Sequence, residues 1–109
     1  MKILFLPEVM DYFLELADIL YEKNYFGFED SALEYAEDLF GDISENLSNK
    51  HRKPAPDYFD RYGENMSYSA FKRNRNTSWY VFFNIYFENG ETVYFVRYIS
   101  NNHVIAQNI

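Results

Sequence analysis

The sequence predicts an α+β fold in which a hairpin of two helices packs on one face of a small, mainly antiparallel sheet. The first half of the chain has apolar residues at helical spacing, and the second half has long runs of aromatic and β-branched residues. The chain has 109 residues, close to the commonest size of one domain. We therefore expect a single domain over residues 1–109.

The N-terminal segment predicts a strand followed by a helix. The apolar run KILFL at 2–6 has the length of a strand, and Pro7 both ends it and suits the first turn of a helix. From there apolar residues recur every three or four positions, with a second stripe of Asp and Glu at the same period. An amphipathic helix is expected over roughly 8–24.

A second helix is predicted directly after a short loop. Gly27 is a plausible breaker of the first helix. The stretch SALE at 31–34 matches a capping box, in which Ser31 and Glu34 satisfy free backbone N–H groups at a helix start. The apolar face continues to about residue 49, so the two helices form a hairpin that lies on a sheet.

The rest of the chain predicts a connection and then three strands. Residues 50–66 contain two prolines, a glycine and mixed charges without a period, as in a connecting segment. Strands are expected in SYSAFKR at 67–73 and on both sides of Asn89-Gly90, the strongest short-range signal for a β-hairpin. The predicted order is β-α-α-β-β-β.

A two-residue turn at Asn89-Gly90 also predicts the register of the last two strands. Glu88 then faces Glu91, Phe82 faces Arg97, and Tyr80 faces Ile99. The helices are expected to cover the face with Trp79, Val81, Phe83, Ile85, Phe87, Tyr94, Val96 and Tyr98. The other face is expected to be open, with Tyr80, Phe82, Asn84, Tyr86, Val93, Phe95, Arg97 and Ile99.

Charge is distributed unevenly along the chain. Residues 1–49 hold twelve Asp or Glu and two Lys, a balance of −10, whereas residues 50–109 hold five acids and eight Lys or Arg, a balance of +3. A local positive field can attract phosphate even in a chain with net charge −7. There is no cysteine, no glycine-rich phosphate loop and no His pattern with metal spacing, so we expect neither a metal nor another cofactor.

The apolar start of the chain is too short for a signal peptide or a membrane span, because Pro7, Glu8 and Asp11 interrupt it. We therefore expect a cytoplasmic protein without membrane contact.

Two groups of cations are candidates for binding. Lys72, Arg73 and Arg75 form a cluster that can bind phosphate, or that is merely the charged, solvent-exposed turn between two strands. Arg97 lies in a strand of otherwise uncharged residues, so it needs a carboxylate, an aromatic face or a ligand. His103, after the last strand, is a candidate for proton transfer, although a lone histidine in a tail is more often neither acid nor base.

The order β-α-α-β-β-β, the segment FKRNRNTSWYVFF at 71–83 and the ending YFVRYISNNHVIAQNI at 94–109 resemble the RelE/ParE superfamily of bacterial toxins. The resemblance spans nearly the whole chain. It implies the toxin of a type II toxin–antitoxin system, of the kind also described as plasmid stabilization proteins. RelE-like members cut messenger RNA on the ribosome without a metal, and ParE-like members inhibit DNA gyrase. Both are silenced by a cognate antitoxin that wraps the toxin in a hetero-oligomer.

The resemblance also implies which residues act. The basic positions of the family match Lys72, Arg73 and Arg97. Metal-free RNA cleavage needs proton transfer, for which His103 and Tyr80 are the candidates. RNA or a protein partner is expected to contact Arg75, Phe82, Tyr86 and Phe95.

The sequence departs from the pattern of the family at two positions. Trp79 stands where an arginine is often found, and His103 follows Ser-Asn-Asn where another arginine is expected. Three functions therefore stay open: an endoribonuclease that inhibits translation, a non-enzymatic gyrase inhibitor, and a decayed toxin kept as a protein-binding module.

Overall fold

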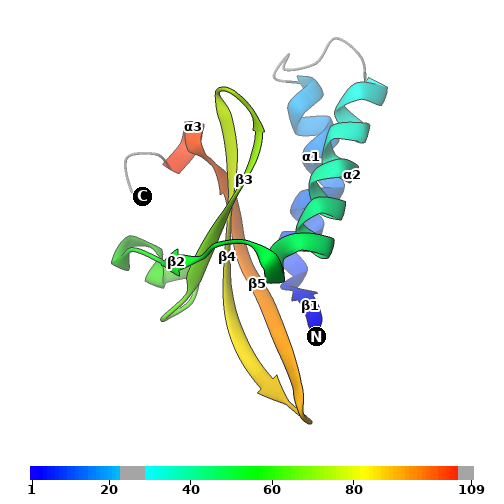
Figure 1. Cartoon of the computed structure of the whole chain (residues 1–109). Helices are drawn as coiled ribbons and strands as arrows, with labels where there is room; N and C mark the ends of the chain where they lie inside the picture. The colour runs from blue at the N-terminus through cyan, green and yellow to red at the C-terminus, as the bar shows by residue number, and fades with distance from the viewer. Residues whose placement is uncertain (23–28, 106–109) are drawn as a thin grey trace.

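Helices α1 (Pro7–Glu22) and α2 (Glu29–Asn46) lie side by side on one face of a five-stranded sheet (Figure 1). The structure is a computed structural model and describes residues 1–22 and 29–105. The strands are β1 (Lys2–Phe5), β2 (Lys53–Pro54), β3 (Ser67–Asn74), β4 (Thr77–Glu88) and β5 (Glu91–Asn101). The remaining elements are the 3₁₀ segments η1 (Leu47–Asn49) and η2 (Asp57–Tyr62), and the short helix α3 (Asn102–Ile105). The α+β class is confirmed.

The strand order across the sheet is β1-β5-β4-β3-β2. β1 runs parallel to β5, and the other three pairings are antiparallel, so the sheet is mainly antiparallel as predicted. The two-residue strand β2 was not predicted, and it lies in the segment that the sequence marked as a connection. Its pairing with β3 gives that connection a fixed place at one edge of the sheet.

The start of α1 at Pro7 agrees with the prediction, whereas its predicted end at about residue 24 lies outside the described residues. α2 begins at Glu29, so the start predicted by the capping box at Ser31 is wrong by two residues. The expected breaker Gly27 lies outside the described residues. At its other end α2 continues as the 3₁₀ segment η1, which ends at Asn49 near the predicted boundary.

The main hydrophobic core lies between the two helices and the sheet. Leu16 of α1, Leu39 of α2 and Phe83 of β4 have no exposed surface. Phe5 contacts Phe13 and Phe40 with ring centroids 6.0 and 5.1 Å apart, so aromatic rings join β1 to both helices. Burial of one such side chain stabilises the fold by about 1.5–3 kcal/mol, and the helices are held chiefly by this apolar contact.

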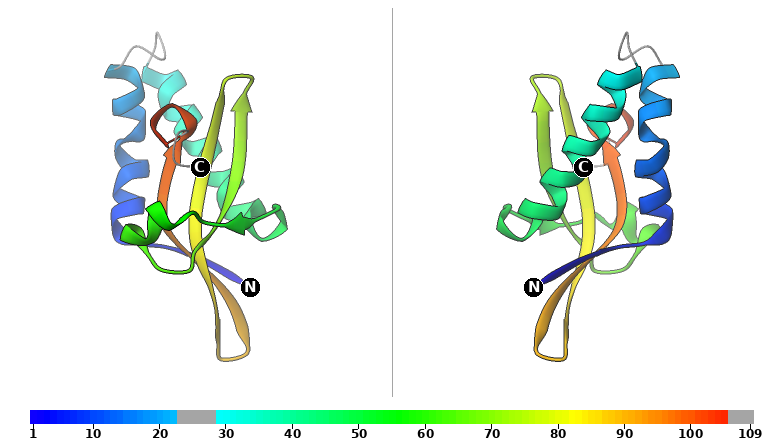
Figure 2. Two further views of the ribbon diagram at one scale, coloured as in Figure 1. Left: turned by 90° about the vertical axis from the view of Figure 1, so that its left-hand side faces the viewer. Right: turned by 90° about the vertical axis from the view of Figure 1, so that its right-hand side faces the viewer.

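The β4–β5 hairpin turns at Asn89-Gly90, as predicted. Asn89 and Gly90 have φ values of 51° and 76°, which is the left-handed region that the two central residues of a type I′ turn require. Glu88 faces Glu91, which confirms the register next to the turn. The tip of this hairpin projects beyond the helices in each view (Figures 1 and 2).

Farther from the turn, the predicted register of β4 and β5 is wrong by one residue. Phe83 faces Val96 but Phe82 faces Tyr98, so Arg97 is an extra residue without a partner of its own, a β-bulge. Beyond the bulge every side chain of β5 changes face. Ile99 therefore joins the core under the helices, and Tyr98 packs on the opposite face.

The face opposite the helices is not open, because η2 covers its centre. Phe59 stacks on Phe82 with ring centroids 4.3 Å apart, and Tyr62 stacks on Tyr98 at 3.8 Å with the rings nearly parallel. Phe82 has no exposed surface, so its expected exposure is wrong. Figure 1 shows this cover beside β2, on the side of the sheet away from α1 and α2.

Candidate functional site

Arg97 is held by neutral neighbours on the face that η2 covers. Its Nε donates to Oδ1 of Asn84 at 2.6 Å, and one terminal nitrogen donates to the Tyr86 hydroxyl at 3.0 Å. The guanidinium carbon lies 4.8 Å from the centroid of the Phe95 ring, a cation–π contact. The structure thus brings three predicted residues together, Arg97, Tyr86 and Phe95.

Gly63 gives the Arg97 side chain its space. A Cβ added at Gly63 would lie 2.6 Å from Cδ of Arg97 and 3.1 Å from the sulfur of Met66. The segment that follows η2 therefore passes directly over the stem of Arg97. In the described part of the chain no carboxylate contacts this guanidinium, and its second terminal nitrogen has no partner.

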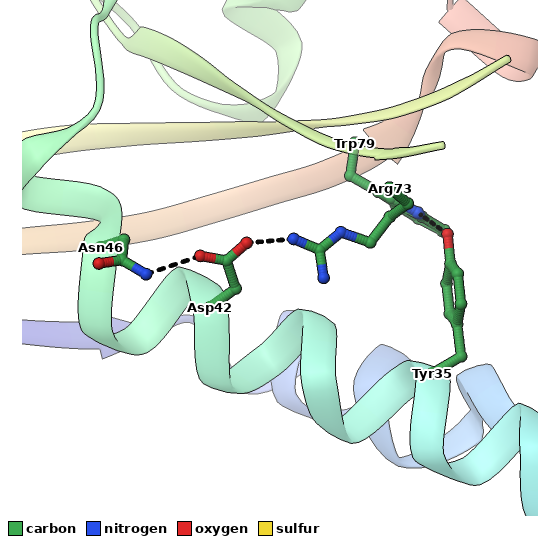
Figure 3. A network of polar contacts seen from close by, with 5 residues as sticks. All are labelled: Tyr35, Asp42, Asn46, Arg73 and Trp79. Atoms are coloured by element: carbon green, nitrogen blue, oxygen red, sulfur yellow. Dashed lines mark hydrogen bonds and ion pairs between the residues drawn. The ribbon is translucent and has the colours of Figure 1, made fainter. Parts of the chain in front are cut away.

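Arg73 lies on the helix side of the sheet, away from the other candidates. Its guanidinium forms an ion pair with Asp42 of α2, whose other oxygen accepts from Asn46 (Figure 3). The two side chains of the pair are 19% and 23% exposed, so water screens them little. Next to them Trp79 Nε1 donates to the Tyr35 hydroxyl at 2.8 Å. Arg73 therefore ties β3 to α2.

His103 lies at the end of the sheet that carries the β3–β4 turn. Its Nε2 is 3.1 Å from Oγ1 of Thr77, and its backbone N–H donates to the side chain of Asn101. It lines a small hollow of about 160 Å³ together with Leu20 and Tyr35 of the helices. The His103 side chain therefore lies at the end of the sheet with the β3–β4 turn, away from the Arg97 side chain.

Lys72 and Arg75 are exposed, and both are far from Arg97 along the sheet. Lys72 pairs with Ser78, whereas Arg97 lies beside Phe82. The four residue steps along β4 from Ser78 to Phe82 span about 13 Å, because a strand rises about 3.3 Å per residue. A single phosphate group is therefore too small to contact both Lys72 and Arg97. The predicted catalytic residues do not form one site.

A basic hollow at the edge of the sheet brings a different set together. It encloses about 520 Å³ and is lined by Lys50, His51, Lys53, Tyr68, Ala70 and Tyr80. Lys72 follows Ala70 by two residues and so lies on the same face of β3. No carboxylate is among the residues that line this basic hollow.

Local pairing explains why these side chains meet. Lys53 of β2 faces Tyr68 of β3, and Ala70 of β3 faces Tyr80 of β4. The rings of Tyr68 and Tyr80 pack edge to face with centroids 6.0 Å apart. The Nζ of Lys50 lies 4.8 Å from the centroid of the Phe71 ring, which belongs to the core on the helix side of β3.

Sequence reasoning missed three of these residues, Lys50, His51 and Lys53. The available signal was KHRK at 50–53, three cations and a histidine in four residues directly before Pro54. That run was treated as part of an aperiodic connection. Only the pairing of β2 with β3 places it beside Lys72 and Tyr80.

Two tyrosines on the sheet and on α1 have raised pKa values. Burial, together with the hydrogen bond to Tyr62, raises the pKa of Tyr98 to about 12, although the hydrogen bond to Ser100 acts in the opposite direction. Burial likewise raises the pKa of Tyr12. Tyr98 therefore keeps its proton at neutral pH, and cannot serve there as a base.

Among residues 1–22 and 29–105, no three His, Asp or Glu side chains cluster as a metal site would need, and no described helix is long and apolar enough to cross a membrane. Comparisons with protein-family models, with curated proteins and with solved structures found no match to this chain. Function is therefore inferred from the side chains and the fold.

Proposed function

We propose that this chain is the toxin of a type II toxin–antitoxin system and that it inhibits translation by cutting messenger RNA. The observation that carries the proposal is the basic hollow, where Lys50, His51 and Lys53 meet Tyr68 and Tyr80. Cations attract the phosphate backbone, and tyrosine rings stack unpaired bases at about 1–3 kcal/mol each. This combination favours single-stranded RNA over a basic or a purely apolar ligand.

The side chains of the basic hollow also suit metal-independent cleavage. His51 takes the proton of the ribose 2′-hydroxyl, whose oxygen forms a bond to phosphorus while the bond to the 5′-oxygen breaks. The leaving 5′-oxygen takes a proton from a tyrosine hydroxyl, for which Tyr80 is the candidate. Lys50 and Lys53 stabilise the negative charge that gathers on the phosphate. The products are a 2′,3′-cyclic phosphate and a 5′-hydroxyl.

The fold supports the same proposal. A helix pair on one face of a mainly antiparallel sheet, with a parallel N-terminal strand, is compatible with the arrangement that the RelE/ParE resemblance implies. The expected partners are a cognate antitoxin and, in the cytoplasm, the ribosome with its mRNA. In this proposal the antitoxin silences the toxin by covering cations that the RNA needs.

A second candidate function is a ParE-like inhibitor of DNA gyrase or another protein-binding module. It is favoured by the contacts of two cations that were expected to be catalytic, because both bind groups within the chain. Arg73 is paired with Asp42, and Arg97 donates to Asn84 and Tyr86. A protein that only binds its target needs no free cation for a transition state.

One comparison separates the two functions. The purified protein is added to ribosomes that translate a reporter mRNA, and cuts are mapped by primer extension. In parallel it is added to DNA gyrase, and supercoiling is measured. We expect cuts in the mRNA and unchanged supercoiling. Loss of supercoiling with intact mRNA would replace the ribonuclease by the gyrase inhibitor. No effect in either assay would reject both of these activities and leave a module that binds another protein.

A further inference from the structure

The outer side of the helix pair carries an apolar groove that the proposed function does not use. Its apolar walls are Met10, Phe13, Leu14, Leu33, Ala36 and Phe40, and it encloses about 470 Å³. Leu14 is 76% exposed and Leu33 is 49% exposed. A helix that packs on a sheet normally turns polar residues outward, so neighbouring exposed leucines on two helices indicate a surface that a partner covers.

Carboxylates surround this helix groove. Glu37 lines it beside Leu33, and Asp18 lies one helical turn from Leu14 on the same side of α1. Helices α1 and α2 together contain twelve Asp and Glu residues and no Lys, Arg or His. Of these acids, Asp42 is neutralised by Arg73 on the sheet side. The field over the groove therefore repels nucleic acid, anionic lipid and the same face of a second copy.

We propose that the helix groove binds a basic amphipathic α-helix of a partner protein. From Leu33 to Phe40 the groove follows α2 for seven residues, which is about 10 Å at 1.5 Å per residue. This length accepts apolar side chains from two turns of a partner helix. Lys or Arg residues that flank the apolar stripe of that helix then reach Glu37 and Asp18.

This inference is independent of the proposed function, because the helix groove and the basic hollow lie on opposite sides of the sheet. Phe13 and Ala36 of the groove belong to the core under the helices, whereas Tyr68 and Tyr80 pack on the other face. Opposite charge on the two sides means that one protein can bind RNA and a basic helix at the same time. Failure of either proposal leaves the other unaffected.

The test uses a synthetic peptide of about 15 residues, long enough for a helix, with a leucine stripe and lysines elsewhere. A fluorescent label reports binding to the full chain by anisotropy. We expect saturable one-to-one binding that weakens as salt rises. Replacing both Leu14 and Leu33 by Ser should weaken binding at least about tenfold, since two buried leucine contacts are lost. Asp18→Asn with Glu37→Gln should weaken it and flatten its salt dependence.

Matched controls make the result specific to the groove. Phe87→Ser changes an exposed apolar residue, 78% exposed, at the far end of β4, and Glu15→Gln removes a carboxylate elsewhere on α1. Neither should change the affinity, and a peptide with Glu in place of Lys should not bind. Equal affinity of wild type and the Leu14/Leu33 variant would overturn the proposal, as would absence of saturable binding. A wild-type dimer that Leu14→Ser dissociates would also overturn it, because a second copy would then occupy the groove.

Discussion

Arg97 Nε donates a hydrogen bond of 2.6 Å to Asn84 Oδ1, so the cation in the β-bulge of β5 is held by an amide rather than by a carboxylate. The second bond of the guanidinium, to the Tyr86 hydroxyl, is also to a neutral group. Removal of Arg97 therefore leaves no buried charge without a partner. The neutral partners of Arg97 therefore determine how much its substitution changes the stability of the fold.

Arg97→Ala should lower the free energy of unfolding by about 1–2 kcal/mol, the cost of one or two hydrogen bonds. That corresponds to a fall in Tm of several degrees in a domain of this size. Arg97→Lys should recover part of the loss, since its ammonium can reach one acceptor but not both. Circular dichroism recorded during thermal unfolding measures the Tm of both variants. A loss above about 3 kcal/mol would indicate an ion pair with a carboxylate instead.

Gly63→Ala should displace Arg97, because the new Cβ would lie 2.6 Å from Arg97 Cδ. The side chain must leave Asn84 and Tyr86, so its NMR signal for Nε–H should move toward that of a free arginine. Gly41 provides the control, since a Cβ there has no neighbour within 4 Å. Gly41→Ala should leave the Arg97 signal unchanged. An unchanged signal in Gly63→Ala would show that the backbone, and not Arg97, gives way.

Arg73→Ala should destabilise the fold without reducing activity per folded molecule. Its ion pair with Asp42 is largely buried and joins β3 to α2, so truncation leaves a carboxylate that is 23% exposed without its cation. We expect a loss of about 1–3 kcal/mol in urea unfolding, and a similar loss for Asp42→Ala. The double variant should lose less than the sum of the two. Activity is followed as growth arrest on expression. If Arg73→Ala abolishes growth arrest while the fold stays intact, Arg73 belongs to the active site.

The raised pKa of Tyr98 predicts a loss of stability at alkaline pH. The pKa is about 12 in the folded chain and the ordinary value is 10.0, so between these values the unfolded state has lost a proton that the folded state keeps. Stability from this group is complete below pH 10 and falls as pH rises toward 12. In Tyr98→Phe the fall over this range should be shallower. The tyrosinate absorbance of the folded wild type can be compared with that of folded Tyr98→Phe as the pH is raised. The difference between them should rise near pH 12, and a rise near pH 10 would contradict the account.

The sequence predicted correctly those structural features that depend only on neighbouring residues. The Asn89-Gly90 turn and the pairing of Glu88 with Glu91 follow from backbone preferences of two residues. The apolar period of α1 predicted its buried stripe, which includes Val9, Phe13 and Leu16. These features need no knowledge of distant segments.

The bulge at Arg97 could not be predicted in this way, because no pattern within residues 91–101 indicates it. Pairing of β1 with β5 ends at Val96, and the backbone of Leu6 donates to Val96 as the chain leaves for α1. The extra residue comes directly after this point and increases the local twist. A strict alternation of faces therefore placed Ile99 and Tyr98 on the wrong sides.

The candidate site was predicted only in part for a related reason. Tyr80 and Lys72 were both candidate catalytic residues, and they do lie at or beside the basic hollow. Its other members come from a stretch with no period, and no pattern indicates that Lys53 pairs with Tyr68. Contacts between an irregular segment and a sheet edge depend on the whole fold.

The central claim is that RNA is cut in the basic hollow with His51 as the base, and the two histidines of the chain provide its most direct test. Cleavage rates of mRNA on translating ribosomes are measured for wild type, His51→Ala and His103→Ala, each checked for folding. His51→Ala should lower the rate constant by about 10²–10⁴, the usual contribution of a general base, and His103→Ala should leave it nearly unchanged. Full activity of His51→Ala, or a loss confined to His103→Ala, would contradict the account.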